Sequence, residues 1–393
     1  MKIKTLANFN IIIPILIAIF NIFLMLNPTE MIFAAKEGLQ LWFNQVLPAL
    51  LPFVIGANLL AKLGFIHFIG ALMSPLMVPL FKVPGAGAFA LLTGFTSGYP
   101  MGAKAVAHLR ETGQIRQHEA HRLLAFSNNA GPLFVVGFIG AGLFDSAKLG
   151  YVLLISHIIS ALGIGLGVRF LFHGDSSDHH RQASGLKQAF HEYQTFRDIH
   201  YKGFGHVLGT SIKNAMEAML LIGGFIIVFC VVIKALEISG LFAMLRYFSS
   251  TNDLYTYSFI TGFAAGLLEV ANGAKIIAQG GTPNSATLSI TAALISFGGF
   301  SVHGQTAHFL RNTDIKFMPY LAAKCLHAIT AGGICLFITS YIVVPAAVLT
   351  TPIFAKSFFQ KLASASYDFA LLVTIMGIMA FCFSYVISYR KGL

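Results

Sequence analysis

Long apolar stretches recur along the chain and are separated by short polar or charged segments. Ten of them approach the roughly 20 residues that a helix needs to cross a bilayer. They comprise residues 8–26, 41–63, 86–109, 119–142, 148–171, 207–235, 257–280, 285–306, 318–344 and 366–389. This pattern predicts an all-α, polytopic membrane protein.

Two of these stretches contain nearly the same phrase. "TGFTSGYPMGAK" spans Thr93–Lys104, and "TGFAAGLLEVANGAK" spans Thr261–Lys275. The two TGF triplets that open these phrases are 168 positions apart. After three extra residues in the second copy the offset becomes 171, and this offset persists as far as the pair Phe126 and Phe297. A constant offset over about 25 residues predicts an internal repeat.

Helix-breaking residues lie inside the first copy, in "SGYPMG" (Ser97–Gly102). Pro lacks a backbone donor and Gly permits a chain reversal. If 86–109 crossed the membrane, the short basic loop 104–122 would lie outside, against the positive-inside rule. We therefore expect re-entrant hairpins at 86–109 and 257–280, which are tolerated where protein or water covers the backbone.

The remaining stretches then give about eight crossings, with both termini in the cytoplasm. Each half reads as crossing, hairpin, crossing, crossing, and an odd number of crossings inverts one half relative to the other. Inverted repeats with broken helices are typical of secondary transporters. We predict one transmembrane domain, 1–393, with a first span at 1–40, repeat A at 41–171, a cytoplasmic loop at 172–206, repeat B at 207–344 and a last span at 345–393.

The composition agrees with this fold class. Hydrophobic residues make up 56% of the chain and charged residues 10%, against about 25% charged in soluble domains. The net charge of +11 could suggest a nucleic-acid partner, but the basic residues cluster at helix ends and in two polar loops. We expect cytoplasmic loops instead. The four cysteines lie in apolar segments and form no CxxC pair, as expected of small buried residues.

The crossing after each hairpin is also interrupted by polar residues. The breaks are expected in "FSNNAGP" (Phe126–Pro132) and "SFGGFSVHGQT" (Ser296–Thr306). Unwinding at such places exposes half-helix ends, which attract anions, and carbonyls, which hold cations. Adjacent Asn residues at membrane depth suggest a binding site, although Asn and Ser also join helices by hydrogen bonds.

Glu269 is the most informative acidic residue because it lies deep in an apolar segment, where a carboxylate is by default a functional candidate. It could bind a coupling cation, carry a proton or accept hydrogen bonds from substrate. The structural alternative is a salt bridge with Lys275. Lys104 and Lys275 could contact substrate or only extend to the membrane interface.

A histidine-containing stretch, "HGDSSDHHRQ" (His173–Gln182), raises the question of a metal site. Its spacing matches no structural zinc pattern, so a solvated loop is the preferred interpretation.

Three motifs carry a family resemblance: "TGFTSGYPMGAK", "EAHRLLAFSNNAGPLFVVG" (Glu119–Gly137) and "GLLEVANGAK". They resemble the sporulation integral membrane proteins of the nucleoside-recognition (Gate) domain family, of the stage V dipicolinate-transport type. The likeness covers roughly 41–344. Ser127 and Ala130 stand where the family motif is expected to have Cys and Ser. More distantly, the chain is similar to concentrative nucleoside transporters, whose hairpins and unwound helices hold substrate and sodium.

The resemblance implies a secondary-type transporter of a small anionic or heteroaromatic metabolite, dipicolinic acid during spore formation, in the outer forespore membrane. Together with the breaks it gives these candidate substrate-binding residues: Ser97, Gly98, Tyr99, Gly102, Lys104, Ser127, Asn128, Asn129, Glu269, Asn272, Lys275, Ser301, His303 and Gln305. Because dipicolinate is a dianion, Glu269 would repel it unless protonated or bound to a cation. We therefore expect coupling to Na+ or H+ near Asn128, Asn129 or Glu269, and no other cofactor or metal.

The expected partners are a small-molecule substrate and the lipid bilayer, without nucleic acid; a homo-oligomer is left open. The alternatives are a nucleoside or nucleobase transporter and a subunit or scaffold of a spore-membrane complex. A membrane-embedded enzyme is disfavoured because the sequence has no H-E-x-x-H or G-x-S-x-G motif and no paired intramembrane Asp.

Overall fold

A computed structural model describes residues 2–171, 186–200, 203–244, 254–281 and 283–341. Every regular element in this part of the chain is a helix, which confirms the predicted all-α fold. The predicted last span, 366–389, and the histidine-containing stretch 173–182 lie outside the described residues.

The chain begins with α1 (Lys2–Leu26) and then bends by 103° into a long run of helix. This run consists of α2 (Pro28–Leu41), a π-helical turn η1 (Trp42–Val46) and α3 (Leu47–Lys62). Pro28 occupies the first turn of α2, where its missing N–H has no helical partner to lose. The boundary expected at residue 40 therefore falls inside continuous helix.

Two helices were not predicted from the apolar pattern. Helix α4 (Phe65–Phe81) follows a bend of 86° after α3, and α9 (Leu186–His200) lies within the loop expected at 172–206. They pack together through aromatic rings: the Phe196 ring lies 4.5 Å from that of His67, and the Phe190 ring 5.4 Å from that of Phe68. Part of the expected loop is therefore a docked helix.

Both predicted hairpins are present. Helices α5 (Gly87–Ser97) and α6 (Met101–Glu111) form the first, and α12 (Leu254–Leu268) and α13 (Val270–Gln279) form the second. The Arg122 side chain donates a hydrogen bond to the Lys82 carbonyl at 2.6 Å. The segments before and after the first hairpin therefore lie on the same side of the molecule, as a re-entrant hairpin requires.

The crossings after the hairpins are broken as predicted. The first consists of α7 (Gln117–Ser127) and η2 (Leu133–Leu143), and the second of α14 (Ser285–Phe297) and α15 (Gly299–Leu310). The second break is narrower than the expected Ser296–Thr306. It lies at Gly298 and at Gly299, the first residue of α15, whose φ angles are +91° and +72°, and left-handed backbone of this kind ends a helix.

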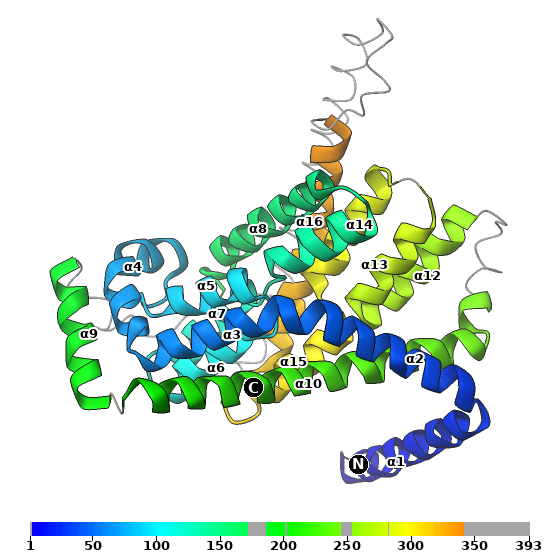
Figure 1. Cartoon of the computed structure of the whole chain (residues 1–393), viewed down its shortest axis with the longest axis horizontal. Helices are drawn as coiled ribbons and strands as arrows, with labels where there is room; N and C mark the ends of the chain where they lie inside the picture. Colours follow the sequence, from blue (N-terminus) through cyan, green and yellow to red (C-terminus); the bar gives the residue numbers. More distant parts are fainter. Residues whose placement is uncertain (1, 172–185, 201–202, 245–253, 282, 342–393) are drawn as a thin grey trace, which may run out of the picture.

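Three long helices complete the described fold: α8 (Ala147–Val168), α10 (Phe204–Ile238) and α16 (Phe317–Tyr341). Figure 1 shows α10 running the length of the molecule beside α2 and α3, and α8, α14 and α16 pack against one another. Moving α8 by the offset of 171 gives 318–339, which lies inside α16. The repeat seen in the sequence thus extends to the order and length of the helices.

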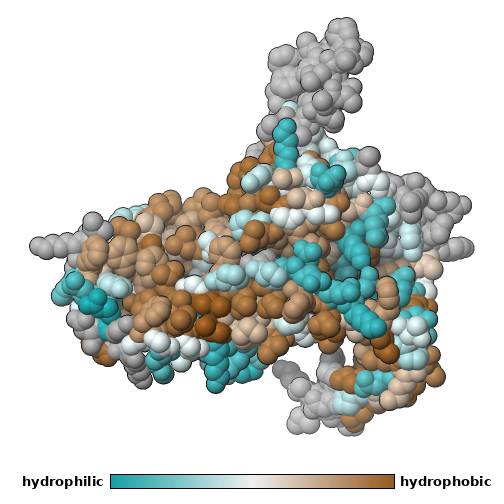
Figure 2. All heavy atoms as spheres, viewed as in Figure 1, coloured by the Kyte–Doolittle hydropathy of each residue, from teal (hydrophilic) through white to brown (hydrophobic). Residues whose placement is uncertain are grey.

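The described residues include four helices long and apolar enough to cross a membrane, or six if each of two bent pairs counts as one span. The halves of the broken crossing α7–η2 have 11 residues each, too few to span alone. Large apolar side chains are exposed on the outside, among them Ile159, Leu220 and Met25. Figure 2 shows apolar residues over most of the visible face, as expected of a surface that meets lipid.

Candidate substrate site

The tip of the first hairpin rests directly on the break after α7. Gly98, with φ +80°, ends α5, and a cis peptide bond joins Tyr99 to Pro100. A Cβ on Gly98 would lie 2.7 Å from the Gly131 nitrogen. Only glycine allows the two irregular backbones to approach so closely.

Two other glycines of the repeated phrase fit around the Ser127 carbonyl. A Cβ on Gly94 would lie 1.6 Å from this oxygen, and one on Gly102 would lie 2.1 Å from it. In the second hairpin, a Cβ on Gly273 would lie 2.2 Å from the Cα of Gly266. The glycines of the phrase therefore serve close packing, between hairpin and break in one half and between the two hairpin helices in the other.

Glu269 forms the tip of the second hairpin and caps α13. Its carboxylate accepts hydrogen bonds from the backbone N–H of Ala271 at 3.1 Å and of Asn272 at 2.8 Å, and from the Asn272 side chain at 2.9 Å. A carboxylate at a helix N-terminus is stabilised by the unpaired N–H groups and the helix dipole. Glu269 is only 4% exposed, and it forms no ion pair with another of the described residues.

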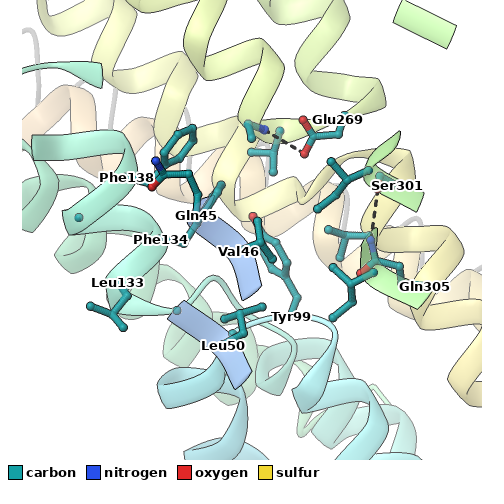
Figure 3. A pocket seen from close by; sticks show the side chains of 18 of the residues that line it. Gln45, Val46, Leu50, Tyr99, Leu133, Phe134, Phe138, Glu269, Ser301 and Gln305 are labelled. Atoms are coloured by element: carbon teal, nitrogen blue, oxygen red, sulfur yellow. Dashed lines mark hydrogen bonds between the residues drawn. The ribbon is translucent and has the colours of Figure 1, made fainter. Parts of the chain in front are cut away.

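These irregular tips and breaks surround a cavity of about 350 Å³ (Figure 3). The α2–α3 run and η2 contribute Gln45, Val46, Leu50, Leu133, Phe134 and Phe138, the hairpin tips contribute Tyr99 and Glu269, and α15 contributes Ser301 and Gln305. The lining is mostly apolar with a few polar groups, the usual make-up of a small-molecule site.

Aromatic rings form one wall of this cavity. The Phe134 ring lies 5.5 Å from that of Phe138 in a stacked arrangement and 6.3 Å from that of Tyr99, edge to face. Opposite them, the Gln305 amide donates to the Ser301 hydroxyl at 3.2 Å. The arrangement suits a small flat ring that bears hydrogen-bonding groups.

Five of the fourteen predicted site residues line the cavity: Gly98, Tyr99, Glu269, Ser301 and Gln305. The others lie elsewhere. Six are buried without lining the cavity: Ser97, Gly102, Ser127, Asn128, Asn129 and His303. Asn272 donates hydrogen bonds to the Glu269 carboxylate, and Lys104 and Lys275 contact other groups.

Asn128 joins the first hairpin to repeat B. Its side-chain oxygen accepts from Ala103 N–H at 3.3 Å, and its amide donates to the hydroxyls of Thr306 at 3.0 Å and Tyr320 at 2.8 Å. This is the helix-joining role that the sequence left open for Asn. Its neighbour Asn129 donates to the Phe126 carbonyl at 2.7 Å.

Three buried oxygen atoms near the first break have no hydrogen-bond partner among the described residues: Ser97 Oγ, Ser127 Oγ and Asn129 Oδ1. Hydroxyl and amide oxygens are ligands suited to a hard cation such as Na+. No cluster of three or more His, Cys, Asp and Glu residues suited to a transition metal occurs in the described part of the chain.

His303 and Lys275 differ from their expected roles. The His303 ring is enclosed by Phe297 at 4.5 Å and Tyr320 at 5.5 Å between centroids, so it packs in an aromatic cluster. Lys275 forms an ion pair with Glu37 at 3.1 Å near the surface, with both side chains more than 40% exposed. The suggested Lys275–Glu269 salt bridge is therefore wrong.

A second and larger cavity of about 740 Å³, here called the vestibule, contains Lys104. Its basic side chains are Lys62, Lys104, Arg311, His108, His206 and His308, and its acidic ones are Glu111 and Glu217. Lys104 Nζ lies 3.4 Å from the Asn214 carbonyl and 5.7 Å from the centre of the Phe309 ring. The vestibule is a polar chamber with a surplus of cationic groups.

The cavity and the vestibule follow one another along the same elements. On α3 the lining passes from Leu50 to Val54, and on α15 from Gln305 to His308, one helical turn in each case. On α10 it passes in the same way from Ile222 to Ala218. An apolar cluster that includes Leu50, Val54, Met101, Ala218 and Ile222 separates the two chambers.

Comparison with known proteins decides the family. A family model described as nucleoside recognition matches residues 43–142. The chain is 34% identical over 339 residues to the sporulation integral membrane protein YlbJ of Bacillus subtilis (strain 168), which covers 83% of this chain and 82% of the relative. The chain belongs to this family of sporulation integral membrane proteins. No solved structure matches it.

The nucleoside-recognition match runs from η1 to η2, so in this family member it includes the first hairpin and the first break. The aromatic residues Phe134 and Phe138 of η2 were missed as wall residues because an apolar run gives no sign of which face meets a cavity. Lys324, His327 and His157, buried side by side near the first break, were also missed. An intramembrane lysine was the available signal for them.

Proposed function

We propose that this family member is a secondary transporter of a small anionic heteroaromatic metabolite, dipicolinate during spore formation. The observation that carries the proposal is the pair of chambers in series, with both hairpin tips, the first break and α15 meeting at the inner one. Broken helices that converge on a central site support alternating access in transporters. The outer forespore membrane, with both termini cytoplasmic, is part of the same proposal.

The surplus of cationic groups in the vestibule supports an anionic substrate. Lys62, Lys104 and Arg311 would attract a dianion at the chamber entrance, since a lined cavity focuses the field of its charges. Further in, the ring of dipicolinate would pack on the wall formed by Phe134 and Phe138.

Glu269 supports coupling to a cation. A charged carboxylate in the inner cavity repels a dianion, so the substrate enters with a proton on Glu269 or with Na+ bound nearby. The unpartnered oxygens of Ser97, Ser127 and Asn129 are the groups that would hold Na+. Either ion would bring positive charge with the substrate.

A nucleoside is the alternative substrate, and two observations favour it. The nucleoside-recognition model matches the first half of the site. The inner cavity has one acid and the neutral polar side chains of Gln45, Tyr99, Ser301 and Gln305, but no cation among its lining residues. A carboxylate and an amide can hydrogen-bond ribose hydroxyls without charge repulsion.

Binding of dipicolinate and of uridine to the purified protein, with and without Na+, distinguishes these proposals. The informative variants are Tyr99→Phe and Gln305→Ala, because both side chains line the cavity, with Gln117→Ala as a control at the surface. Saturable dipicolinate binding weakened by both cavity variants supports the first proposal. Binding of uridine alone supports the second, and binding of neither rejects both cargoes.

A further inference from the structure

A cluster of buried titratable side chains, here called the lysine–histidine cluster, lies outside both chambers and beside the first break. It consists of Lys324, His327 and His157. Lys324 of α16 is 1% exposed, and its Nζ donates to the Asn128 carbonyl at 2.9 Å and lies 2.9 Å from His327 Nδ1. Among the described residues, no ion pair gives Lys324 an acidic partner. A buried ammonium without a counter-charge costs several kcal/mol, so this lysine is not a simple packing residue.

The partners of the two histidines determine where protons can reside. His327 Nε2 lies 3.0 Å from the His157 carbonyl, which can only accept, so Nε2 carries the hydrogen and Nδ1 accepts from Lys324. His157 Nε2 lies 3.0 Å from the Ala130 N–H, which can only donate, so its hydrogen is on Nδ1, 2.8 Å from Ser296 Oγ. Both imidazoles are therefore held neutral, and Lys324 is the group able to gain or lose a proton.

The same hydrogen bonds connect the lysine–histidine cluster to both helix breaks. Asn128 and Ala130 belong to the break between α7 and η2, and Ser296 lies two residues before Gly298, the break between α14 and α15. A change of charge on Lys324 acts directly on the carbonyl of Asn128. Gly131, three residues further, lines the inner cavity.

We propose that Lys324 is a proton-binding site that links the protonation state of the protein to the geometry of the two breaks, with His327 and His157 as positioning residues. The proton is taken up when the Asn128 carbonyl and His327 Nδ1 can both accept from Lys324, and it is released when the break moves away. This inference rests on the proposed transport function and specifies a proton as a coupling ion, at a place separate from Glu269.

The titratable groups around Lys324 come from three helices. Tyr320 and His327 are on α16, His157 is on α8 and His303 is on α15. Helix α14 contacts the lysine–histidine cluster through Ser296, and α14 has no titratable residue. Helix α7 contacts α16, and its titratable residues His118, Glu119, His121 and Arg122 lie near its start, away from the break. Substituting Lys324 alone therefore separates its contribution to any pH effect from that of the neighbouring titratable groups.

The test uses accessibility of the inner cavity and needs no substrate. A single cysteine is placed by Val302→Cys in full-length protein whose native cysteines are replaced, and its reaction rate with an impermeant maleimide is measured in liposomes from about pH 5.5 to 8.5. Val302 lines the cavity, and a two-state equilibrium linked to one proton changes by up to about tenfold per pH unit. Rates are corrected for the known pH dependence of thiolate reactivity with a peptide thiol.

The measurement is repeated with Lys324→Met, Lys324→Gln and the surface control Lys148→Gln. We expect a pH-dependent rate that persists in Lys148→Gln and becomes flat in both Lys324 variants. If Lys324 only packs, its variants would change the maleimide reaction rate at every pH but keep the pH slope of the parent protein. This outcome overturns the proposal. A flat profile in the parent protein overturns it as well.

Failure of the transport proposal has a different signature. If neither dipicolinate nor uridine binds while the pH slope depends on Lys324, the cargo is wrong and the proton site stands. If dipicolinate binds and the pH slope is the same in the Lys324 variants as in the parent protein, the proton site is rejected and the transport proposal is retained. If one Lys324 variant fails to fold, the other provides the same reading.

Discussion

The side-chain amide of Asn128 donates a hydrogen bond of 2.8 Å to the hydroxyl of Tyr320, a residue 192 positions further along the chain. This bond joins the break of the first half to a long helix of the second. It places a polar pair, fully buried, where the sequence suggested a substrate contact. The two halves are therefore joined by polar bonds as well as by apolar packing.

Asn128→Ala is expected to lower the free energy of unfolding by about 3 kcal/mol, because it leaves Ala103 N–H, Thr306 and Tyr320 without their partner. Tyr320→Phe removes only one of these bonds and is expected to cost about 1 kcal/mol. Chemical unfolding in detergent checks both values. Equal stability of Asn128→Ala and the parent protein would show that the bonds add nothing.

Gly94→Ala is expected to prevent correct folding, because the new methyl group would lie 1.6 Å from the Ser127 carbonyl oxygen, which is backbone and cannot swing aside. Gly163→Ala in α8 is the matched control: its Cβ would meet nothing within 4 Å, and alanine favours a helix by up to about 1 kcal/mol. Size-exclusion chromatography of the two variants makes the comparison. A monodisperse, normally stable Gly94→Ala protein would contradict the described contact between hairpin and break.

Glu269→Gln is expected to leave the fold intact, since an amide oxygen can still accept from Ala271 N–H or Asn272 N–H. Uptake of dipicolinate into liposomes should continue. An imposed proton or Na+ gradient should accelerate this uptake less than it does in the parent protein, because Glu269 no longer couples to the ion. Glu37→Gln, an acid of the surface, is the control. An unchanged response of Glu269→Gln to both gradients would exclude it from coupling.

Lys104→Gln is expected to weaken the apparent affinity for dipicolinate roughly three- to tenfold at low salt, with less effect at high salt, because the vestibule acts through its charge. Uridine uptake, which carries no charge, should not change. Lys148→Gln on the exposed start of α8 provides the comparison. A salt-independent loss in Lys104→Gln would indicate direct contact or misfolding instead of attraction at a distance.

The ion pair between Arg110 and Asp314 should give a small stability contribution that disappears in acid. Two hydrogen bonds of 2.8 Å from Arg110 lower the pKa of Asp314, with a smaller contribution from the charge of Arg110. A lowered folded-state pKa stabilises the protein above the ordinary Asp value of about 4, and this is lost as the pH falls through the lower, folded value.

Because both side chains are partly exposed, the contribution at neutral pH should be at most about 1 kcal/mol. The difference in thermal midpoint between the parent protein and Asp314→Asn measures it, and that difference should shrink below pH 4. The exchanged pair Arg110→Asp with Asp314→Arg should recover most of it. A difference that grows in acid would have the wrong sign for this ion pair.

The sequence predicted the hairpins and breaks well because each depends on local residues: Gly98 and Pro100 at one tip, and Gly298 at one break. The offset of 171 also located the second half from the first. Helix α4 was missed because its 17 residues are shorter than a span and contain two prolines, and α9 because its pattern is that of a polar surface helix.

The site was predicted less well than the fold, for a physical reason. Residue type and spacing show that Asn128, His303 and Lys275 are unusual at membrane depth, but not which neighbour satisfies them. The partners of Asn128 and Lys275, which are Tyr320 and Glu37, come from distant segments. Glu269 was found because an acid in an apolar hairpin is informative without knowledge of its contacts.

The one-turn separation between cavity and vestibule has an electrical consequence. If water fills both chambers, the membrane potential falls mainly across the apolar cluster between them, over about one helical turn, roughly 5 Å. Moving one elementary charge through a potential of 100 mV requires about 2.3 kcal/mol, and a dianion requires about twice that. The work depends on the charge and the potential and not on the length of the barrier, so a short barrier concentrates the whole electrical driving force on a charged cargo into one local step.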